Sequence, residues 1–339
     1  MTQSLRFIAL FLLFASPVLH AELSLNPLNW FKEPPRESRV ADATEEAVAQ
    51  QKLEKGITRM EAGRNRSAKR IFKNIAKEHP TAKAAADALY FRARILMEQG
   101  EWSDAFESLQ EIVRIHPSYS KFNRVISAQF DAATALMEGA REPIIFGTIP
   151  GFRKYDNAVK FFQQIVANAP YGDYAPLSLM NIAIISRQRD QSDDAIDALD
   201  RLINYYPQSM LAPDAYYKLA QTYADLVKGY EYDQGSTREA IRYYEDFLIL
   251  FPKDPNAGEV EASLEDMENL LAKSRLNLGD FYYIYRNNNT AALIFYNEAI
   301  DVAPNSDSAA TARDRIADIE SGVEPATGYR LVRMLLFAD

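Results

Sequence analysis

The chain has 339 residues, of which 25% are charged and 47% are apolar, and its formal net charge is -9. This is the balance of a globular protein, and the acidic excess disfavours electrostatic binding of the whole chain to nucleic acid or anionic lipid, although a local basic patch is compatible with it. The sequence contains no cysteine, which excludes disulfides, zinc–thiolate sites, thiol nucleophiles and lipid attachment through cysteine.

Residues 1–21 predict a secretory signal peptide. Arg6 is followed by the apolar run 7–15, a Ser-Pro break and Ala21, which is the layout of an export signal. We expect cleavage after Ala21, with an uncleaved anchor or a buried N-terminal helix as the alternatives, because the run is short for a transmembrane helix. Residues 22–42, which include "NPLNWFKEPPRES", are predicted to be a polar linker interrupted by prolines.

One spacing recurs six times further along the chain, an alanine followed twelve residues later by a proline. Apolar residues stand at the alanine and four, seven and eight residues after it, which places them on one face of an α-helix. The proline cannot continue the helix, and it biases the residue before it away from helical geometry. We therefore expect six amphipathic helices, each terminated at the residue before its proline. The pairs are Ala68–Pro80, Ala105–Pro117, Ala158–Pro170, Ala195–Pro207, Ala240–Pro252 and Ala292–Pro304.

A second helical pattern precedes these helices, most clearly over 84–100, 125–139, 176–188, 212–226 and 270–286. Small residues at matching places predict that the two helices of each pair approach closely. A pair of this size buries too little apolar surface alone, so that stacking is needed for a continuous core. We expect an all-α repeat domain of about six helix pairs over residues 43–320. The small residues are Gly56, Ala93, Ala133, Ala183, Ala220 and Gly279.

Three insertions lengthen the repeats, at 139–155, at 228–237 and after Pro252, where we expect a longer helix around 259–278. The apolar part of the first, residues 145–152, is expected either to fold back onto the repeats or to contact a partner. Tyr230 and Tyr232 make the second insertion a candidate binding surface.

The tail 321–339 contains the apolar segment "GYRLVRMLLFAD" with Arg330 and Arg333. It is predicted to cap the open end of the last helix pair, or to dock on a partner or a membrane surface.

The alanine–aromatic–proline pattern, with "LGDFY" at 278–282, resembles the tetratricopeptide repeat over residues 51–320. That resemblance implies a right-handed superhelical solenoid of helix pairs. The second half also resembles the BamD (YfiO) family, the tetratricopeptide component of the outer-membrane β-barrel assembly machinery. The Asp-Gln…Thr-Arg-Glu-Ala run at 233–240 and the Phe-Tyr-rich segment that ends at Arg286 carry this resemblance.

The BamD resemblance implies a periplasmic scaffold that docks on BamA and engages unfolded barrel precursors. Arg238 matches a family arginine, whereas Phe295 stands where the family commonly has an arginine used toward BamA. Family members usually carry a lipidated cysteine after the signal peptide. Because this chain has no cysteine, we expect it to associate with the outer membrane through its protein partners.

No residue pattern predicts catalysis, and we expect no enzyme activity, cofactor or metal site. Nucleotide-binding loops, zinc-protease signatures and serine-hydrolase elbows are absent from the sequence. His79 and His116 occupy the same repeat position, directly before the proline, which indicates a structural role at helix ends, where a cationic ring would suit the macrodipole.

The first helix of each pair is expected to line a concave groove that binds extended protein segments, because aromatic residues and arginines are favoured at contact centres. The alternative is that Tyr90, Phe130 and Tyr217 pack between neighbouring pairs. The residues predicted to face the groove are Tyr90, Arg94, Phe130, Thr134, Met180, Arg187, Tyr217 and Gln221.

Together these observations predict a non-catalytic periplasmic adaptor of outer-membrane barrel assembly, located at the inner face of that membrane. The expected partners are a BamA-like protein and unfolded outer-membrane proteins, without nucleic acid. A general periplasmic tetratricopeptide scaffold that coordinates cell-envelope or cell-wall proteins is the alternative.

Overall fold

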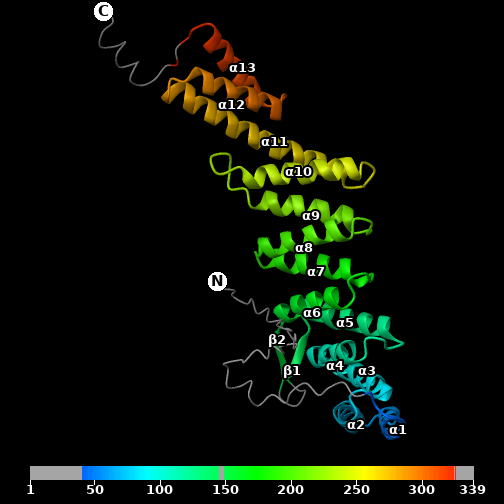
Figure 1. Ribbon diagram of the computed structural model, residues 1–339. Helices are drawn as coiled ribbons and strands as arrows, with labels where there is room; N and C mark the ends of the chain where they lie inside the picture. The colour runs from blue at the N-terminus through cyan, green and yellow to red at the C-terminus, as the bar shows by residue number, and fades with distance from the viewer. Residues whose placement is uncertain (1–39, 145–148, 324, 326–339) are drawn as a thin grey trace, which may run out of the picture. The chain divides into compact units, whose positions relative to one another are not determined.

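The computed structural model describes residues 40–144, 149–323 and 325, and the described residues from Ala41 onward group into one compact unit. The predicted signal peptide, most of the predicted linker and the apolar tail segment after residue 325 lie outside the described residues. Figure 1 shows the described part as a succession of antiparallel helices, each packed against the next in chain order. Helix pairs thus stack into the predicted solenoid.

The first three pairs comprise α1 to α6, with a β-hairpin between the last two helices. Their bounds are α1 (Ala43–Glu61), α2 (Asn65–Glu78), α3 (Lys83–Glu98), α4 (Trp102–Ile115), α5 (Phe122–Met137), β1 (Arg141–Ile144), β2 (Ile149–Arg153) and α6 (Tyr155–Asn168).

The remaining pairs comprise α7 to α12, and a last helix, α13, follows them. The bounds are α7 (Tyr174–Gln188), α8 (Ser192–Tyr205), α9 (Ala212–Asp225), α10 (Gly235–Leu250), α11 (Ala257–Asp280), the π-helical turn η2 (Phe281–Tyr285), α12 (Asn289–Val302) and α13 (Asp307–Glu320).

The second helix of every pair ends where the proline requires it to end. The residue before each proline has φ between -140° and -123° and ψ between 50° and 78°, outside the α region. Its N–H still donates to the carbonyl four residues earlier, which closes the final helical turn. The helix ends predicted from the prolines are therefore confirmed. These residues are His79, His116, Ala169, Tyr206, Phe251 and Ala303.

Small residues bring the two helices of a pair into contact. The alanines at the repeat positions are fully buried, and so are their partners on the first helices. At Gly56 a Cβ atom would overlap the ring of Phe72, and at Gly279 it would overlap the ring of Tyr296. The predicted close approach is confirmed at both ends of the described repeats.

The core continues from pair to pair through aromatic contacts. Phe106 on α4 stacks on Phe161 on α6, with ring centres 3.8 Å apart and planes within 1°. Both side chains are buried, and each contributes about 1.5–3 kcal/mol of apolar burial. The end of the last pair is covered by α13, whose Ala309 and Ala312 are buried.

The first insertion forms an antiparallel β-hairpin, which the sequence analysis did not predict. β1 and β2 pair with a register shift between Arg141 and Pro143. The buried carboxylate of Glu142 accepts hydrogen bonds from the backbone N–H of Ser103 and from Lys154, and this contact fastens the hairpin to α4. Phe152, the described end of the apolar segment, is exposed.

The third insertion lengthens α11 to 24 residues, as the sequence predicted. None of the helices in the described residues combines the length and the apolar character that crossing a membrane would need.

Candidate protein-binding surfaces

Polar side chains link the first helices of successive pairs. Arg187 on α7 donates from Nη1 to Oε1 of Gln221 (3.3 Å) and from Nη2 to Oδ2 of Asp225 (2.7 Å), both on α9. The hydroxyl of Tyr217 on α9 donates to Oε1 of Glu259 on α11 at 2.5 Å. The helices α7, α9 and α11 therefore present side chains to a common face, and this is the face on which the sequence predicted a groove.

The aromatic residues predicted for this face are partly used in packing. The ring of Phe130 lies 5.5 Å from that of Phe162 and 5.1 Å from that of Tyr174. The ring of Tyr217 lies 6.3 Å from that of Tyr244 and 6.1 Å from that of Phe247. The contacts with Phe162, Tyr244 and Phe247 lie within one helix pair, whereas the contact between Phe130 and Tyr174 joins two neighbouring pairs, as the alternative interpretation proposed for Phe130.

Tyr217 is nevertheless a polar group as well as a packing residue. Burial raises the pKa of Tyr217 to about 12, and the hydrogen bond to Glu259 acts in the same direction. The hydroxyl therefore remains a proton donor throughout the physiological range and holds α9 against α11.

Four other predicted groove residues lie in different environments. Met180 is only 6% exposed and belongs to the core, because α7 is packed on nearly all sides, so its side chain does not reach a groove surface. Thr134 is half-buried, and its Oγ1 has no hydrogen-bond partner among the described residues. Tyr90 is half-buried with its ring 6.3 Å from that of Phe91, and Arg94 is exposed.

The second insertion is a compact loop built around Gln234. The buried amide of Gln234 donates to the carbonyls of Gly229 (2.9 Å) and Tyr232 (2.8 Å), and its Oε1 accepts from Thr237 (2.9 Å). The Tyr232 side chain is 61% exposed, and Arg238 on the following helix is exposed as well. Tyr232 on the loop and Arg238 on α10 are therefore both accessible at the surface.

A contact with the next helix fixes the orientation of this loop. The ammonium group of Lys273 on α11 lies 4.2 Å from the ring centre of Tyr230, within the range of a cation–π interaction.

Four aromatic rings form a continuous ladder at the end of α11. The ring of Tyr285 is 6.2 Å from that of Phe281, Phe281 is 5.5 Å from Tyr282, and Tyr282 stacks on Phe295 of α12 at 5.4 Å. Tyr285 is 77% exposed and Phe281 44% exposed. We call Tyr285, Phe281, Tyr282 and Phe295 the aromatic ladder.

The ladder is placed by the π-helical turn η2, a feature that is frequent at functional sites. On the same turn, Tyr283 is buried and its hydroxyl donates to the carbonyl of Val323 at 2.6 Å. The sequence indicated a helix here and singled out Phe295, but it did not indicate that three further rings would join it.

An apolar cleft of about 560 Å³ lies between the turn that joins α6 to α7 and the turn that joins α8 to α9. Tyr171 is fully exposed at its edge, and Tyr205 and Met210 are largely exposed. Sequence analysis missed this cleft because turn residues lie outside the helical periodicity, although the sequences "APYG" and "YYPQSM" mark its two sides.

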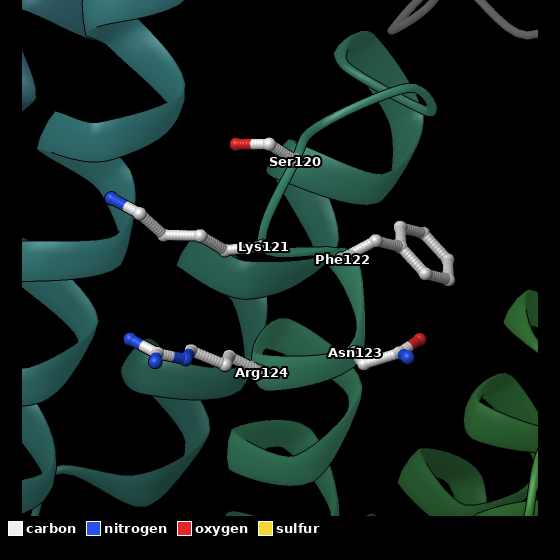
Figure 2. Close-up of a pocket in the computed structure, with 5 residues that line it drawn as sticks. All are labelled: Ser120, Lys121, Phe122, Asn123 and Arg124. Atoms are coloured by element: carbon white, nitrogen blue, oxygen red, sulfur yellow. The ribbon is translucent and has the colours of Figure 1, made fainter.

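A second hollow, of about 430 Å³, lies at the turn before α5 and is shown in Figure 2. Lys121 and Arg124 extend toward one side and Phe122 toward the other. Lys121 is engaged by Asp87 on α3 at 2.8 Å, and Tyr119 donates to the same carboxylate at 2.6 Å. This hollow is therefore part of the contact between the second and third pairs.

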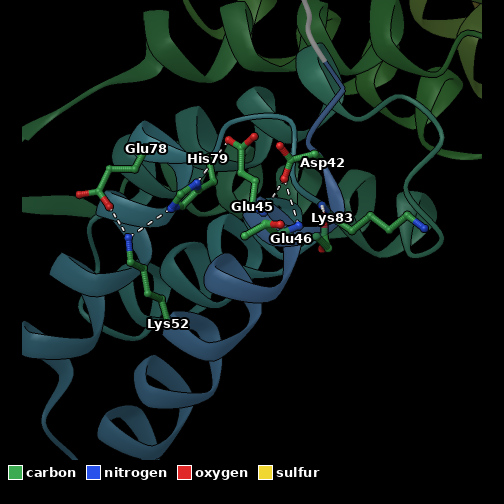
Figure 3. A network of polar contacts seen from close by, with 8 residues as sticks. Asp42, Glu45, Glu46, Lys52, Glu78, His79 and Lys83 are labelled. Carbon is green, nitrogen blue, oxygen red and sulfur yellow. Dashed lines mark hydrogen bonds and ion pairs between the residues drawn. The ribbon is translucent and has the colours of Figure 1, made fainter.

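Polar contacts also close the first repeat, as Figure 3 shows. Lys52 on α1 donates to Glu78 at the end of α2 (2.5 Å) and approaches Nε2 of His79 (3.2 Å), whose Nδ1 lies 3.3 Å from Glu45. The Glu46 carboxylate accepts from the first N–H groups of α3. His79 thus serves the contact between α1 and α2.

His116 lies at the corresponding end of α4, where its side chain is half-buried. Burial lowers the pKa of His116, and its Nε2 has no hydrogen-bond partner among the described residues. A neutral ring is favoured there, so the expectation of a cationic ring at this helix end is wrong, because desolvation outweighs the helix macrodipole. In the described part of the chain, no three His, Asp or Glu side chains converge as a metal site would require.

Comparison with known proteins places these surfaces in context. A family model described as outer membrane lipoprotein, YfiO, matches residues 152–321, and a tetratricopeptide-repeat model matches residues 53–120. The aromatic ladder, the 228–237 loop and the apolar cleft all lie within residues 152–321.

Two similar relatives are outer membrane protein assembly factors BamD. The one from Rickettsia prowazekii is 27% identical over 44% of this chain and 59% of its own length, and the one from Caulobacter vibrioides is 24% identical over 41% of this chain and 45% of its own length. The chain spans about half the length of these relatives. A solved tetratricopeptide repeat protein from Parabacteroides merdae is 15% identical over 79% of this chain and 97% of its own, with a TM-score of 0.31.

Proposed function

Because this chain belongs to the YfiO family of outer membrane lipoproteins, we propose that it is a non-catalytic adaptor in the assembly of outer-membrane β-barrel proteins. In this proposal it works in the cell envelope, on the periplasmic side of the outer membrane, and binds a BamA-like protein and extended segments of barrel precursors. The observation that carries the proposal is the aromatic ladder, an exposed apolar surface within the part of the chain that matches the family.

The distribution of exposed apolar side chains supports a partner surface in that part. Among the described residues, no large apolar side chain is exposed between positions 49 and 143. Further along the chain, Tyr171, Met210 and Tyr285 are all exposed by well over half. Clustered exposed apolar surface indicates a binding site, and aromatic residues contribute strongly to binding energy at such sites.

We propose that the aromatic ladder is the anchor for the BamA-like partner. Phe281 and Tyr285 are its exposed members, whereas the Phe295–Tyr282 stack supports them from α12. Tyr232 on the 228–237 loop and Arg238 on α10 would supply the polar rim of the same interface.

The test is co-purification of the BamA-like protein from detergent extracts with the tagged chain. Phe281→Ala with Tyr285→Ala should reduce recovery of the partner at least tenfold, since each hot-spot aromatic contributes about 2 kcal/mol. The matched control is Ile249→Ala with Leu250→Ala, which removes two exposed apolar side chains from α10. Recovery of the partner at the wild-type level with the ladder variant would contradict the assignment.

We propose that precursor segments bind on the face shared by the first helices. Arg94 is the predicted groove residue most free to bind, and Tyr90 lies one helical turn before it. Tyr90→Ala with Arg94→Ala should weaken binding of an extended, aromatic-rich peptide, with Arg124→Ala as a control that removes an exposed cation from the first turn of α5. An unchanged peptide affinity in the double variant would refute this part of the proposal without touching the ladder.

A further inference from the structure

Helix α2 carries a concentration of positive charge that the acidic chain as a whole does not suggest. Between residues 62 and 77 the sequence has six basic residues and no acidic one, although acidic residues outnumber basic ones 47 to 38 in the complete chain. Four of the six are spaced four, three and four residues apart: Arg66, Arg70, Lys73 and Lys77. That spacing places them in one row along a helix, about 17 Å long.

The structure leaves this row open to solvent. All four side chains are exposed, and the opposite side of α2 is buried through Ala68, Phe72, Ile75 and Ala76. No ion pair involves any of the four among the described residues. The acidic residue of α2, Glu78, forms an ion pair with Lys52, as Figure 3 shows. We call Arg66, Arg70, Lys73 and Lys77 the basic row.

A hollow of about 870 Å³ continues the basic row at the start of α2. Arg64, Arg66 and Arg70 line it together with Ser67 and Gln99. Three guanidinium groups around one open hollow suit phosphate groups, to which arginine donates paired hydrogen bonds.

We propose that the basic row docks the chain on the surface of an anionic phospholipid membrane. Charge complementarity selects phosphate-bearing headgroups, and the absence of an exposed large apolar side chain on the described part of α2 distinguishes this surface from a protein interface, which needs apolar or aromatic anchors. The apolar side of α2 is committed to the core, so that binding is electrostatic and does not insert the helix. This contact is independent of the proposed barrel-assembly function.

The expected strength follows from the number of charges. A lysine or arginine near an anionic membrane surface favours binding by about fivefold, so four residues together account for about two to three orders of magnitude in partitioning. Because the side chains are exposed, the interaction should be abolished at about 1 M salt, where the Debye length is about 3 Å.

The experiment is co-sedimentation of the full chain with vesicles of phosphatidylcholine alone and of phosphatidylcholine mixed with phosphatidylglycerol. We expect binding to the mixed vesicles to exceed binding to the neutral ones at low salt. Apolar insertion of the chain termini would not by itself distinguish the two kinds of vesicle. The variant Arg66→Gln, Arg70→Gln, Lys73→Gln, Lys77→Gln should lose at least 100-fold in partitioning to the mixed vesicles.

The matched control removes four exposed cations elsewhere, through Arg124→Gln, Lys160→Gln, Lys228→Gln and Lys253→Gln, and should bind within a fewfold of wild type. A loss of equal size in the control would overturn the proposal, because net charge would then explain binding. If the row variant unfolds, Lys73→Gln with Lys77→Gln should still lose more than tenfold.

Two other results would overturn the proposal. The first is loss of binding in Arg330→Gln with Arg333→Gln while the row variant still binds, because binding would then belong to the tail. The second is equal binding of wild type to both vesicle types together with row-dependent capture of an acidic protein, because the row would then serve a protein partner.

Discussion

Gly279→Ala tests whether close approach of helices, rather than helix propensity, selected the glycine in α11. The ring of Tyr296 on α12 occupies the space that a Cβ atom at residue 279 would need. Tyr296 cannot easily turn away, because its ring is fully buried and its hydroxyl donates to Oδ1 of Asp280 at 2.8 Å. Arg315 on α13 contacts the same carboxylate at 3.2 Å, which fixes the acceptor in turn.

The magnitude is the difference between two opposing effects. Forcing a methyl group into a packed contact costs about 1–3 kcal/mol. Replacing glycine by alanine inside a helix gains up to about 1 kcal/mol of helix propensity. We therefore expect Gly279→Ala to lower the free energy of unfolding by about 1–2 kcal/mol. Gly258→Ala in the same helix has nothing within 4 Å of its new Cβ atom, and it should be neutral or stabilising by up to about 1 kcal/mol.

Urea denaturation followed by circular dichroism measures both variants, and hydrogen exchange over residues 271–320 shows whether the loss is local. Tyr296→Leu supplies a second check, because removing the ring should make Gly279→Ala less costly than it is in the wild-type background. The reasoning is refuted if Gly279→Ala is as stable as Gly258→Ala, since the ring contact would then place no demand on residue 279.

Three further predictions concern the loop, a helix end and the shared face. Gln234→Ala should cost about 1–3 kcal/mol and expose the 228–237 loop to limited proteolysis, because two carbonyls lose their buried donor, whereas Tyr232→Ala should leave the cleavage pattern unchanged. Because burial lowers the pKa of His116 in the folded state, the unfolded chain binds more protons as the pH falls through 6.5. Stability should thus be full above that pH and decline below it, and His116→Gln should flatten this part of a stability-versus-pH curve. Tyr217→Phe should cost about 1 kcal/mol through the lost bond to Glu259, with the same loss at pH 6 and pH 9 because the pKa of Tyr217 is about 12.

The repeat architecture could be predicted from the sequence because its signals are local. An alanine, an aromatic residue or a leucine four positions later and a proline twelve positions later act within one helix, and residues such as Phe72 and Tyr296 are buried as the periodicity requires. Gly279 could be predicted as a contact position for the same reason, since it is a small residue on the first helix of its pair, as Gly56 is in the first pair.

The features that escaped prediction depend on contacts between distant residues. Glu142 is 39 residues from Ser103, and their hydrogen bond holds a hairpin whose strands show no clear alternation in sequence. Met180 has the spacing of a groove residue, yet its helix is enclosed by neighbours, so that the pattern of one helix cannot show which side remains open. The charge expected on His116 was wrong because burial is a property of the assembled repeat.

Since the core positions are nearly identical from pair to pair, packing alone cannot explain why the outer surfaces differ. Ala68 and Ala292 are both fully buried, and each is followed four residues later by a buried aromatic residue, but the helix that contains Ala68 bears the basic row, whereas the helix that contains Ala292 bears Phe295 of the aromatic ladder. Folding requires neither feature: exposed arginines and lysines add little stability, and an exposed Tyr285 adds less than a buried one. The residues that distinguish one repeat from another, rather than those that define the repeat, are therefore where binding should be sought by mutation.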